Sequence, residues 1–359
     1  MSDIAVELRD VSKCYGACMA LDKLSLTVAK GEFVVLLGPS GSGKTTLLSI
    51  LGGFIEPTTG RVFIAGRDVT LTPPARRPTV TVFQDYALFP HMTVRENVAF
   101  GLAMRHVAAP ERLRLADEAL AVVGLEGFSD RRVHQLSGGQ RQRVALARAI
   151  VIEPTVLLLD EPLGALDVKI RRQMQDELLR LQRSLQATFI HVTHDQEEAM
   201  SIADTIVLLN KGRIEDMGAP ERIYRRPASI FAATFMGDTN LLEGKVTSAV
   251  NGTLAVETSI GRVVTEGHAD VGSKVHISIR PECIRVGLAS EAGAVPLGNA
   301  RLNDFIFQGT HRRCQADVGG GGQAKLLLRL PPELDLAAEK VAALWVRTQD
   351  VILIKEGRS

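Results

Sequence analysis

Hydrophobic and polar positions in the first part of the chain predict strands that lead into a helix. Residues 4–37 alternate short β-rich runs with turn signals and end in FVVLL at 33–37. This last run is apolar at every position, which is typical of a strand covered on both faces in a parallel sheet. KTTLLSILGGF follows with helical spacing, and the glycines at 52–53 indicate the end of that helix.

A helical segment and further strands come next. Between about 93 and 152, apolar residues recur at i, i+3 and i+4, as in ERLRLADEALAVVGL, so we expect a helical insert in an α/β domain. TVLLLDE and TFIHVTHD then have the pattern of buried strands, and the amphipathic IRRQMQDELLRLQRSL lies between them. Strand, helix and strand in this order predict a parallel βαβ unit.

The pattern changes after residue 237. Short alternating runs such as GKVTSAV, KVHISIR and RRCQADV are separated by Gly and Asn turns, and the only long helix expected is PPELDLAAEKVAA. We therefore predict two domains, 1–237 and 238–359, the second a small and barrel-like β domain. The run GGGG at 319–322 is expected at a loop tip.

Composition narrows the function classes. With 42 Lys plus Arg, 41 Asp plus Glu and a net charge of +1, the chain has no overall field that would recruit nucleic acid, so we expect no nucleic-acid partner. The apolar runs are too short to span a membrane, and MSDIAVELRD lacks a secretory pattern, which together favour the cytoplasm. The four cysteines are expected to be free thiols because they lack the partners of a zinc site.

A phosphate-binding loop is the strongest chemical signal. GPSGSGKTT at 38–46 has the spacing G-x-x-x-x-G-K-[ST] directly between a predicted strand and a predicted helix. Glycines let backbone N–H groups surround phosphates, and the helix N-terminus adds its positive dipole. Lys44 is expected to reach the β and γ phosphates of ATP, and Thr45 to ligate Mg²⁺.

Two acids could supply the metal ligand and the base that a phosphate-binding loop needs for hydrolysis. The strand VLLLDEP at 156–162 places Asp160 and Glu161 at its carboxyl end. We expect Asp160 to hold the magnesium and Glu161 to accept a proton from the attacking water. A strand ending in Asp-Glu is common by itself, so this prediction depends on the phosphate loop upstream.

Five motifs together resemble the ATPase subunit of an ABC transporter. They occur in that family's order and cover residues 4–236: GPSGSGKTT, Gln84 in FQDYALFPHMTVRENV, LSGGQ, VLLLDEPLGALD and His194 in HVTHDQEEA. The resemblance implies an α/β P-loop NTPase fold, an ABC ATPase core with a helical subdomain at about 93–152. It also implies a C-terminal all-β domain of the OB/TOBE-like kind.

The resemblance assigns roles to individual residues. Glu161, His194 and Gln84 would be catalytic, and Thr45, Gln84 and Asp160 would hold the metal. The nucleotide would contact Tyr15, Gly38, Pro39, Ser40, Gly41, Ser42, Gly43, Lys44, Thr45, Thr46, Ser137, Gly138, Gly139, Gln140 and Asp167. Asp167 is also compatible with a helix N-cap. His191 has no such match and is expected to be structural. Tyr86, Leu88 and Phe89 would either contact a partner helix or belong to the core.

LSGGQ implies an assembly of two chains. In the family that this sequence resembles, the serine and glycines bind the γ-phosphate of ATP held by the facing subunit. Because each motif occurs once, we predict an ATP-dependent homodimer.

The C-terminal segments FMGDTNLLEGKV, ISIRPECIRV and FIFQGTHRRCQADV resemble the accessory domain of importer ATPases. They favour the spermidine/putrescine branch, with ferric iron, sulfate or another small solute as alternatives. The resemblance implies two transmembrane permease subunits, an indirect solute-binding-protein partner and a peripheral position on the cytoplasmic face of the inner membrane. A soluble ABC ATPase without a transport role is a distant alternative, and the β domain could bind a regulator.

Overall fold

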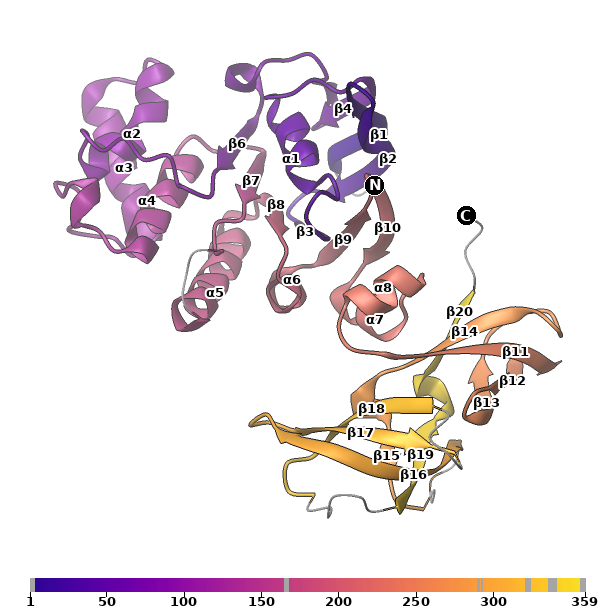
Figure 1. Ribbon diagram of the computed structural model, residues 1–359. Helices are drawn as coiled ribbons and strands as arrows, with labels where there is room; N and C mark the ends of the chain where they lie inside the picture. The colour runs from indigo at the N-terminus through magenta and orange to yellow at the C-terminus, as the bar shows by residue number, and fades with distance from the viewer. Residues whose placement is uncertain are drawn as a thin grey trace. The chain divides into compact units, whose positions relative to one another are not determined.

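The computed structural model describes residues 4–164, 168–288, 291, 293–319, 324–334 and 341–355 (Figure 1). The chain divides into two compact units, Met1–Pro220 and Glu221–Ser359. The boundary expected from sequence, at 237/238, lies later in the chain. Among the residues that the structure describes, no helix has the length and apolarity needed to cross a membrane.

The first unit begins with a four-stranded antiparallel sheet in the order β2-β1-β4-β5. Its strands are β1 (Ile4–Tyr15), β2 (Cys18–Ala29), β4 (Thr59–Ile64) and β5 (Arg67–Asp68). One face packs into the main core of the unit, where Val6, Leu8 and Leu26 are buried. Polar residues alternate with them, as expected for a sheet that is solvated on one side.

A six-stranded sheet forms the centre of this unit, in the order β10-β9-β3-β8-β7-β6. Its strands are β3 (Phe33–Leu37), β6 (Thr79–Val82), β7 (Val156–Asp160), β8 (Thr188–Thr193), β9 (Thr205–Asn210) and β10 (Arg213–Gly218). Neighbouring strands from β6 to β9 are parallel, and β10 is antiparallel to β9. β3 is apolar and buried at every position, as its pattern predicts, and β8 is likewise buried throughout although it includes Thr188, His191 and Thr193.

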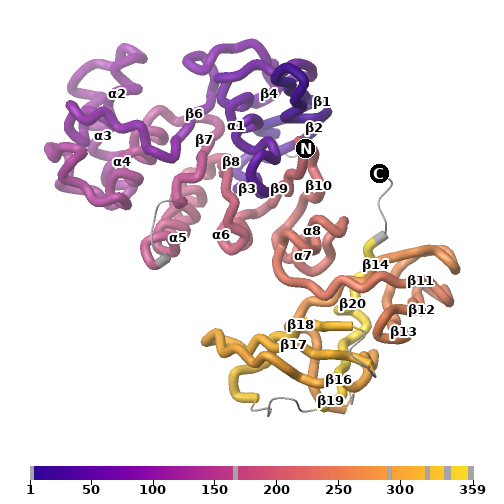
Figure 2. The backbone as a smooth tube through the Cα atoms, in the orientation of Figure 1, coloured from indigo at the N-terminus to yellow at the C-terminus, as the bar shows by residue number. Residues whose placement is uncertain are grey.

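Helices cover this sheet and form a separate group beside it. They are α1 (Lys44–Gly52), α2 (Val94–Met104), α3 (Ala109–Val122), α4 (Gly138–Ile150), α5 (Val168–Leu185) and α6 (Gln196–Ile202), with 3₁₀ turns at Pro74–Arg76 and Val133–Gln135. Helices α2, α3 and α4 share their own core, which includes Val98, Leu120 and Val144. Figures 1 and 2 show this group on the far side of β6 and β7 from α1.

The second unit contains two short helices and two β structures. The helices are α7 (Pro220–Arg225) and α8 (Ile230–Phe235), with 3₁₀ turns at Pro281–Cys283 and Thr348–Asp350. A closed barrel has the order β11-β12-β13-β20-β14, and a five-stranded sheet has the order β15-β19-β16-β17-β18. The first unit is of the α/β kind and the second is rich in strands, which confirms the predicted fold class of an α/β domain followed by a β domain.

The strand bounds of the second unit follow its sequence pattern of short alternating runs. The barrel consists of β11 (Asn240–Val250), β12 (Thr253–Thr258), β13 (Gly261–Glu266), β14 (Lys274–Ile279) and β20 (Val351–Lys355). The sheet consists of β15 (Arg285–Val286), β16 (Ala294–Phe307), β17 (Arg312–Val318), β18 (Ala324–Leu330) and β19 (Val341–Arg347). One shared core joins the two, with Val256, Leu302 and Leu328 among its buried side chains.

One expected helix is not found where the chain can be described. Residues 341–343, the end of the segment PPELDLAAEKVAA, belong to β19, and 335–340 lie outside the described residues. β19 pairs with β16 along most of its length. Long-range pairing therefore overrides the local helical propensity of the alanines.

Arg280 and Asn240 hold the second unit together near its start. Arg280 donates hydrogen bonds to the carbonyls of Tyr224, Ala233 and Gly237, over 2.8 to 3.1 Å. The side chain of Asn240 donates to the carbonyl of Leu327 at 2.9 Å and accepts from its N–H at 2.7 Å. Arg280 thus fastens α7 and α8 to the barrel, and Asn240 joins the barrel to the outer edge of β18.

Candidate active site

The glycine-rich loop lies where the sequence predicts it, between β3 and α1. Gly38, Gly41 and Gly43 all have positive φ, at 157°, 76° and 103°. A Cβ atom added at Gly38 would lie 2.2 Å from the carbonyl oxygen of Leu209, and one at Gly43 would lie 2.7 Å from that of Ala20. Glycine is therefore required at these two positions by space as well as by backbone angle.

Lys44 is buried at the first position of α1. Its Nζ donates to the carbonyl oxygens of Gly38 at 2.9 Å and Pro39 at 3.0 Å. Burial lowers the pKa of Lys44, while the charges of Glu161 and Asp160 act in the opposite direction. Thr45 is exposed at the same helix end, and Thr46 is half-buried. The ammonium group and the Thr45 hydroxyl can therefore meet a phosphate and a cation at one place.

The two acids follow β7. Burial raises the pKa of Asp160, and the neighbouring charge of Glu161 raises it further. Glu161 has a φ of 45°, and its N–H donates to the carbonyl of Val192 at 3.1 Å. His194 Nδ1 lies 3.4 Å from Glu161 Oε1, with the histidine side chain 63% exposed. The carboxylate and the imidazole thus face one another at the open edge of the sheet.

Gln84 joins this group from the loop after β6. A Cβ added at Gly164 would lie 3.9 Å from Gln84 Nε2 and 4.0 Å from Glu161 Oε2, so the two side chains flank the same glycine. β6, β7, β8 and β3 are adjacent and parallel, so their carboxyl ends lie at one edge. Gln84, Glu161, His194 and the phosphate loop each follow one of these four strands, and Asp160 is the last residue of β7 (Figure 1).

Tyr15 lies at the end of the hairpin formed by β1 and β2. Its side chain is 48% exposed, and it pairs with Cys18 across the turn. Ala20 of the same hairpin lies against Gly43, so the hairpin borders the phosphate loop. Lys13 Nζ lies 5.2 Å from the centre of the Tyr15 ring. An exposed ring at this border can stack on a flat ligand.

The LSGGQ segment forms the start of α4. Ser137 is the N-cap residue; its hydroxyl accepts from the N–H of Gln140 at 3.3 Å, and Gln140 Oε1 accepts from the N–H of Ser137 at 2.9 Å. This reciprocal capping box is a role for Gln140 that the spacing S-x-x-Q signals and that the sequence analysis missed. α4 shares a core with α2 and α3, which Figure 2 shows apart from α1, and a Cβ added at Gly139 would lie 3.6 Å from the side chain of Ile170 in α5.

The remaining predicted residues have different outcomes. Asp167 lies outside the described residues. His191 is fully buried, with its Nε2 2.7 Å from Glu198 Oε1, which fits the structural role expected for it. Tyr86 is 9% exposed, and Phe89 is half-buried with its ring 4.6 Å from that of Phe100. Of the two roles considered for Tyr86, the structure favours burial in the protein over contact with a partner helix.

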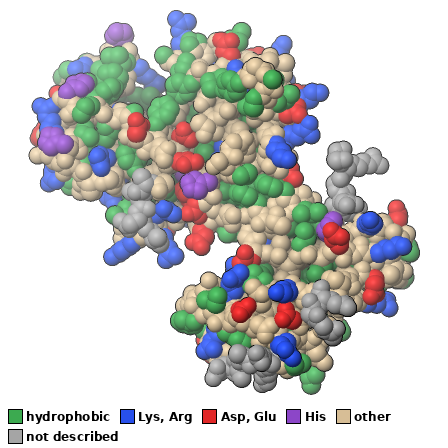
Figure 3. All heavy atoms as spheres, viewed as in Figure 1, with side chains coloured by type: hydrophobic (Ala, Val, Ile, Leu, Met, Phe, Trp, Pro, Cys, Tyr) green, Lys and Arg blue, Asp and Glu red, His purple; other side chains and the backbone are tan. Residues whose placement is uncertain are grey.

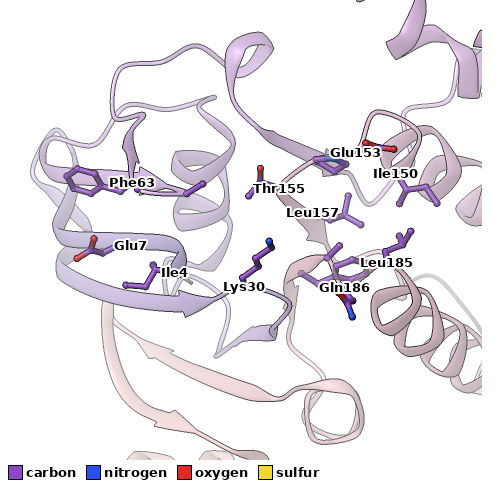
Figure 4. A pocket seen from close by; sticks show the side chains of 15 residues that line it. Ile4, Glu7, Lys30, Phe63, Ile150, Glu153, Thr155, Leu157, Leu185 and Gln186 are labelled. Atoms are coloured by element: carbon purple, nitrogen blue, oxygen red, sulfur yellow. The ribbon is translucent and has the colours of Figure 1, made fainter. Parts of the chain in front are cut away.

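A large cavity lies away from these residues (Figure 4). It has a volume of about 1140 Å³ and is lined by Lys30, Thr155 and Leu185, among others. Thr155 and Ala187 in its wall precede β7 and β8, whereas the acids and His194 lie at or after the carboxyl ends of those strands. The cavity is therefore at the opposite edge of the sheet.

On the face shown in Figure 3, acidic, basic and apolar side chains are interspersed.

Comparisons with known proteins agree with this geometry. The family profile described as ABC transporter matches residues 21–164. The chain is 44% identical to a spermidine/putrescine import ATP-binding protein of Oleidesulfovibrio alaskensis, over 99% of each protein. It is 52% identical to one of Rubrobacter xylanophilus, over 98% of this chain and 94% of that protein.

Solved structures are similar to about three fifths of the chain. One is a dimeric ATP-binding cassette in a post-hydrolysis state bound to ADP and Pi, with a TM-score of 0.53 and 35% identity over 60% of this chain and 98% of that one. Another is a part of an ABC transporter complex from Clostridium perfringens, with a TM-score of 0.58 and 30% identity over 62% of this chain and 90% of that one.

Proposed function

This chain belongs to the family of ABC transporter ATP-binding proteins, and we propose that it hydrolyses ATP to drive the import of the polyamines spermidine and putrescine. The observation that carries the proposal is the extent of the similarity. It runs through both units, over 98–99% of this chain, to proteins whose names state spermidine/putrescine import.

ATP would bind with its phosphates on the loop between β3 and α1. Lys44 would exchange the carbonyls of Gly38 and Pro39 for phosphate oxygens, which are the stronger acceptors for an ammonium group. Tyr15 would stack on the adenine. Thr45, Asp160 and Gln84 offer the oxygen ligands that suit Mg²⁺, which when bound would neutralise phosphate charge.

Glu161 is the group that we propose as general base. Its carboxylate lies beside His194 and Gln84, so a water molecule held among the three could transfer its proton to Glu161. Glu161→Gln keeps the shape and the hydrogen-bonding oxygen but removes the base. We expect this variant to bind ATP and to hydrolyse it more slowly by about a hundredfold or more, measured as phosphate release, since general-base catalysis contributes roughly 10²–10⁴-fold.

A second copy of the chain would complete the site. Ser137, Gly138 and Gly139 lie at the start of α4, whose N-terminus favours an anion, and Figure 1 shows α4 in the helical group apart from α1. We propose that they contact ATP on a partner chain and that Asp167 contributes at the same interface. Glu161→Gln with Mg-ATP should then elute as a dimer in size-exclusion chromatography, and a monomer in the presence of its membrane partners would contradict this.

The transport partners follow from the proposed import role. We infer two transmembrane permease subunits, a solute-binding protein that acts through them, and a peripheral position on the cytoplasmic face of the inner membrane. No nucleic-acid partner is proposed. Membranes solubilised in mild detergent should yield two hydrophobic subunits with the affinity-tagged chain, and purification of the chain alone would count against this assembly.

Uptake of labelled spermidine tests the cargo. A strain lacking this chain should lose most ATP-dependent uptake and regain it with the wild-type chain but not with Glu161→Gln. Ferric iron and sulfate are the alternatives, so the same strain is assayed with each. Normal spermidine uptake in the deletion strain, together with loss of iron or sulfate uptake, would replace the polyamine assignment.

A further inference from the structure

The loop that carries Gln84 is fastened to two helices at its far end. Asn97 of α2 is fully buried; its amide oxygen accepts from the N–H of Phe89 at 2.8 Å and its amide nitrogen donates to the Phe89 carbonyl at 3.1 Å. Arg148 of α4 donates to the carbonyl of Ala87 at 2.7 Å and to that of Tyr86 at 2.6 Å. Residues 86–89 are thereby tied to the helical group.

Tyr86 links the same loop to the strand that bears the acids. Its Oη donates to the carbonyl oxygen of Pro162 at 3.2 Å, and Pro162 follows Glu161 directly. The pKa of Tyr86 is raised by burial, so the phenol keeps its proton at neutral pH and remains a donor. The buried ring leaves the hydroxyl few other orientations.

The turn that Tyr86 contacts has an unusual backbone. Glu161 has a φ of 45°, in the left-handed region that a residue with a Cβ disfavours. Its N–H donates to the carbonyl of Val192 at 3.1 Å, and its carbonyl accepts from the N–H of Gly164 at 3.2 Å. The Tyr86 hydroxyl adds a bond at the next carbonyl. The direction of the Glu161 carboxylate therefore depends on contacts that hold this turn.

We propose that Tyr86 is a positioning residue for ATP hydrolysis, which holds the Glu161–Pro162 turn, and that Arg148 connects it to α4. The inference rests on the proposed ATPase function and extends it. Ser137, the N-cap of α4, belongs to the segment proposed to meet a partner's ATP. A displacement of α4 therefore acts on the Tyr86 backbone and, through the Tyr86 hydroxyl, on the turn of Glu161. Binding at the interface would thus adjust the base in the same chain.

Tyr86→Phe tests this inference with the smallest change. It keeps the buried ring and removes only the hydroxyl. In the assembled transporter, made with the full-length chain, we expect kcat for ATP to fall about threefold to tenfold, as the loss of one hydrogen bond implies, with KM for ATP unchanged. Tyr224→Phe is the matched control, because the Tyr224 hydroxyl bonds Glu282 in the second unit, at 2.5 Å.

Arg148→Lys tests the connection to α4. Lysine keeps the positive charge but lacks the two-pronged donor that reaches both carbonyls. We expect a similar fall in kcat, and the double variant with Tyr86→Phe should lose little more than either single variant, because both changes interrupt one connection. Thermal denaturation of each variant accompanies the kinetics.

The outcomes separate this inference from the proposed function. A wild-type complex without ATPase activity would overturn the proposed function, and this inference with it. An active wild-type complex in which Tyr86→Phe retains the wild-type kcat would overturn the inference alone. The inference alone would also be overturned if Tyr86→Phe lowers kcat no more than Tyr224→Phe does. It would be overturned as well if the fall in kcat of the double variant equals the product of the falls from Tyr86→Phe and Arg148→Lys.

Discussion

At the scale of single residues, the phosphate loop depends on atoms far away in the sequence. The backbone at Gly38 lies against the carbonyl of Leu209, and that at Gly43 lies against the carbonyl of Ala20. Gly41 has no such neighbour, although its φ is also positive. Gly38 and Gly43 are therefore required both by close backbone contacts and by their φ angles, whereas Gly41 is required by its φ angle alone.

Gly38→Ala should be much more damaging than Gly41→Ala. The methyl group at position 38 would overlap a backbone carbonyl, whereas at position 41 only the backbone angle is unfavourable. We expect losses in the free energy of unfolding of about 3 kcal/mol or more at position 38 and about 1 kcal/mol at position 41. Urea denaturation of both variants measures the difference, and equal losses would contradict the close approach at Gly38.

Asp160 provides a test of electrostatics. Because burial and Glu161 raise its pKa, the ionised carboxylate is less favourable in the folded protein than in the unfolded chain. Its contribution to stability is therefore present below the ordinary aspartate pKa and is lost as pH rises through the folded pKa. Without nucleotide, Asp160→Asn should melt a few degrees above wild type at pH 7.5, and the gap should close at about pH 3.9.

Asp68→Asn is the control for this prediction, with the opposite sign. Hydrogen bonds from Thr70 lower the pKa of Asp68, so its ionised form is the favourable one. That variant should melt no higher than wild type at pH 7.5. An Asp160→Asn protein that melts lower than wild type at this pH would show that the Asp160 carboxylate is stabilised by contacts other than those described.

At the scale of elements, the start of α4 combines two roles that substitution can separate. The Gln140 side chain completes the capping box, and the exposed helix end is proposed to meet a phosphate. Glutamate can accept the same hydrogen bond, and its charge suits a helix N-terminus. The negative charge of a glutamate at position 140 would, however, repel the phosphate of a partner's ATP.

Gln140→Glu should therefore leave stability intact and impair hydrolysis. We expect an unchanged or slightly higher melting temperature and a fall in ATPase rate of about tenfold, equivalent to about 1.4 kcal/mol. Gln140→Ala should instead lose about 1 kcal/mol of stability, because the N–H of Ser137 loses its acceptor. If Gln140→Glu hydrolyses ATP like wild type, α4 does not approach a phosphate through its first turn.

The elements that the sequence predicted correctly are those whose signals are local. The strand before Gly38, the helix from Lys44 and the strand ending at Asp160 each have a continuous pattern and a defined end. The burial of Tyr86 could not be predicted, because its hydroxyl bonds a carbonyl 76 residues away. The helix expected to reach 343 was wrong in its last part, because pairing with β16 is not visible in the alanine-rich sequence.

At the scale of the whole molecule, the division into units lies between Pro220 and Glu221, after the first residue of α7. Arg280 fastens the carbonyls of Tyr224, Ala233 and Gly237 to the barrel, so α7 and α8 are held by the second unit. The sequence placed the boundary after these helices because the β pattern begins there. The Arg280 hydrogen bonds are among the contacts that place α7 and α8 with the second unit.

A chain that ends at Gly237 should therefore keep two helices without their anchor. We expect trypsin to trim it rapidly toward Pro220, whereas a chain that ends at Pro220 should resist, since Met1–Pro220 is one compact unit. Mass spectrometry of the fragments measures this. Equal resistance of both chains would mean that α7 and α8 are stable without Arg280.

The strand order of the central sheet also bears on how the protein is made. The phosphate loop is synthesised early, but β3 beside it pairs with β8, in which Phe189 is the partner of Phe33, and Gly38 fits against Leu209. At about 5–20 residues per second, the ribosome needs roughly 8 to 30 seconds to add the intervening residues. During that interval the nascent chain carries the phosphate-loop segment without the strands that support it in the folded protein.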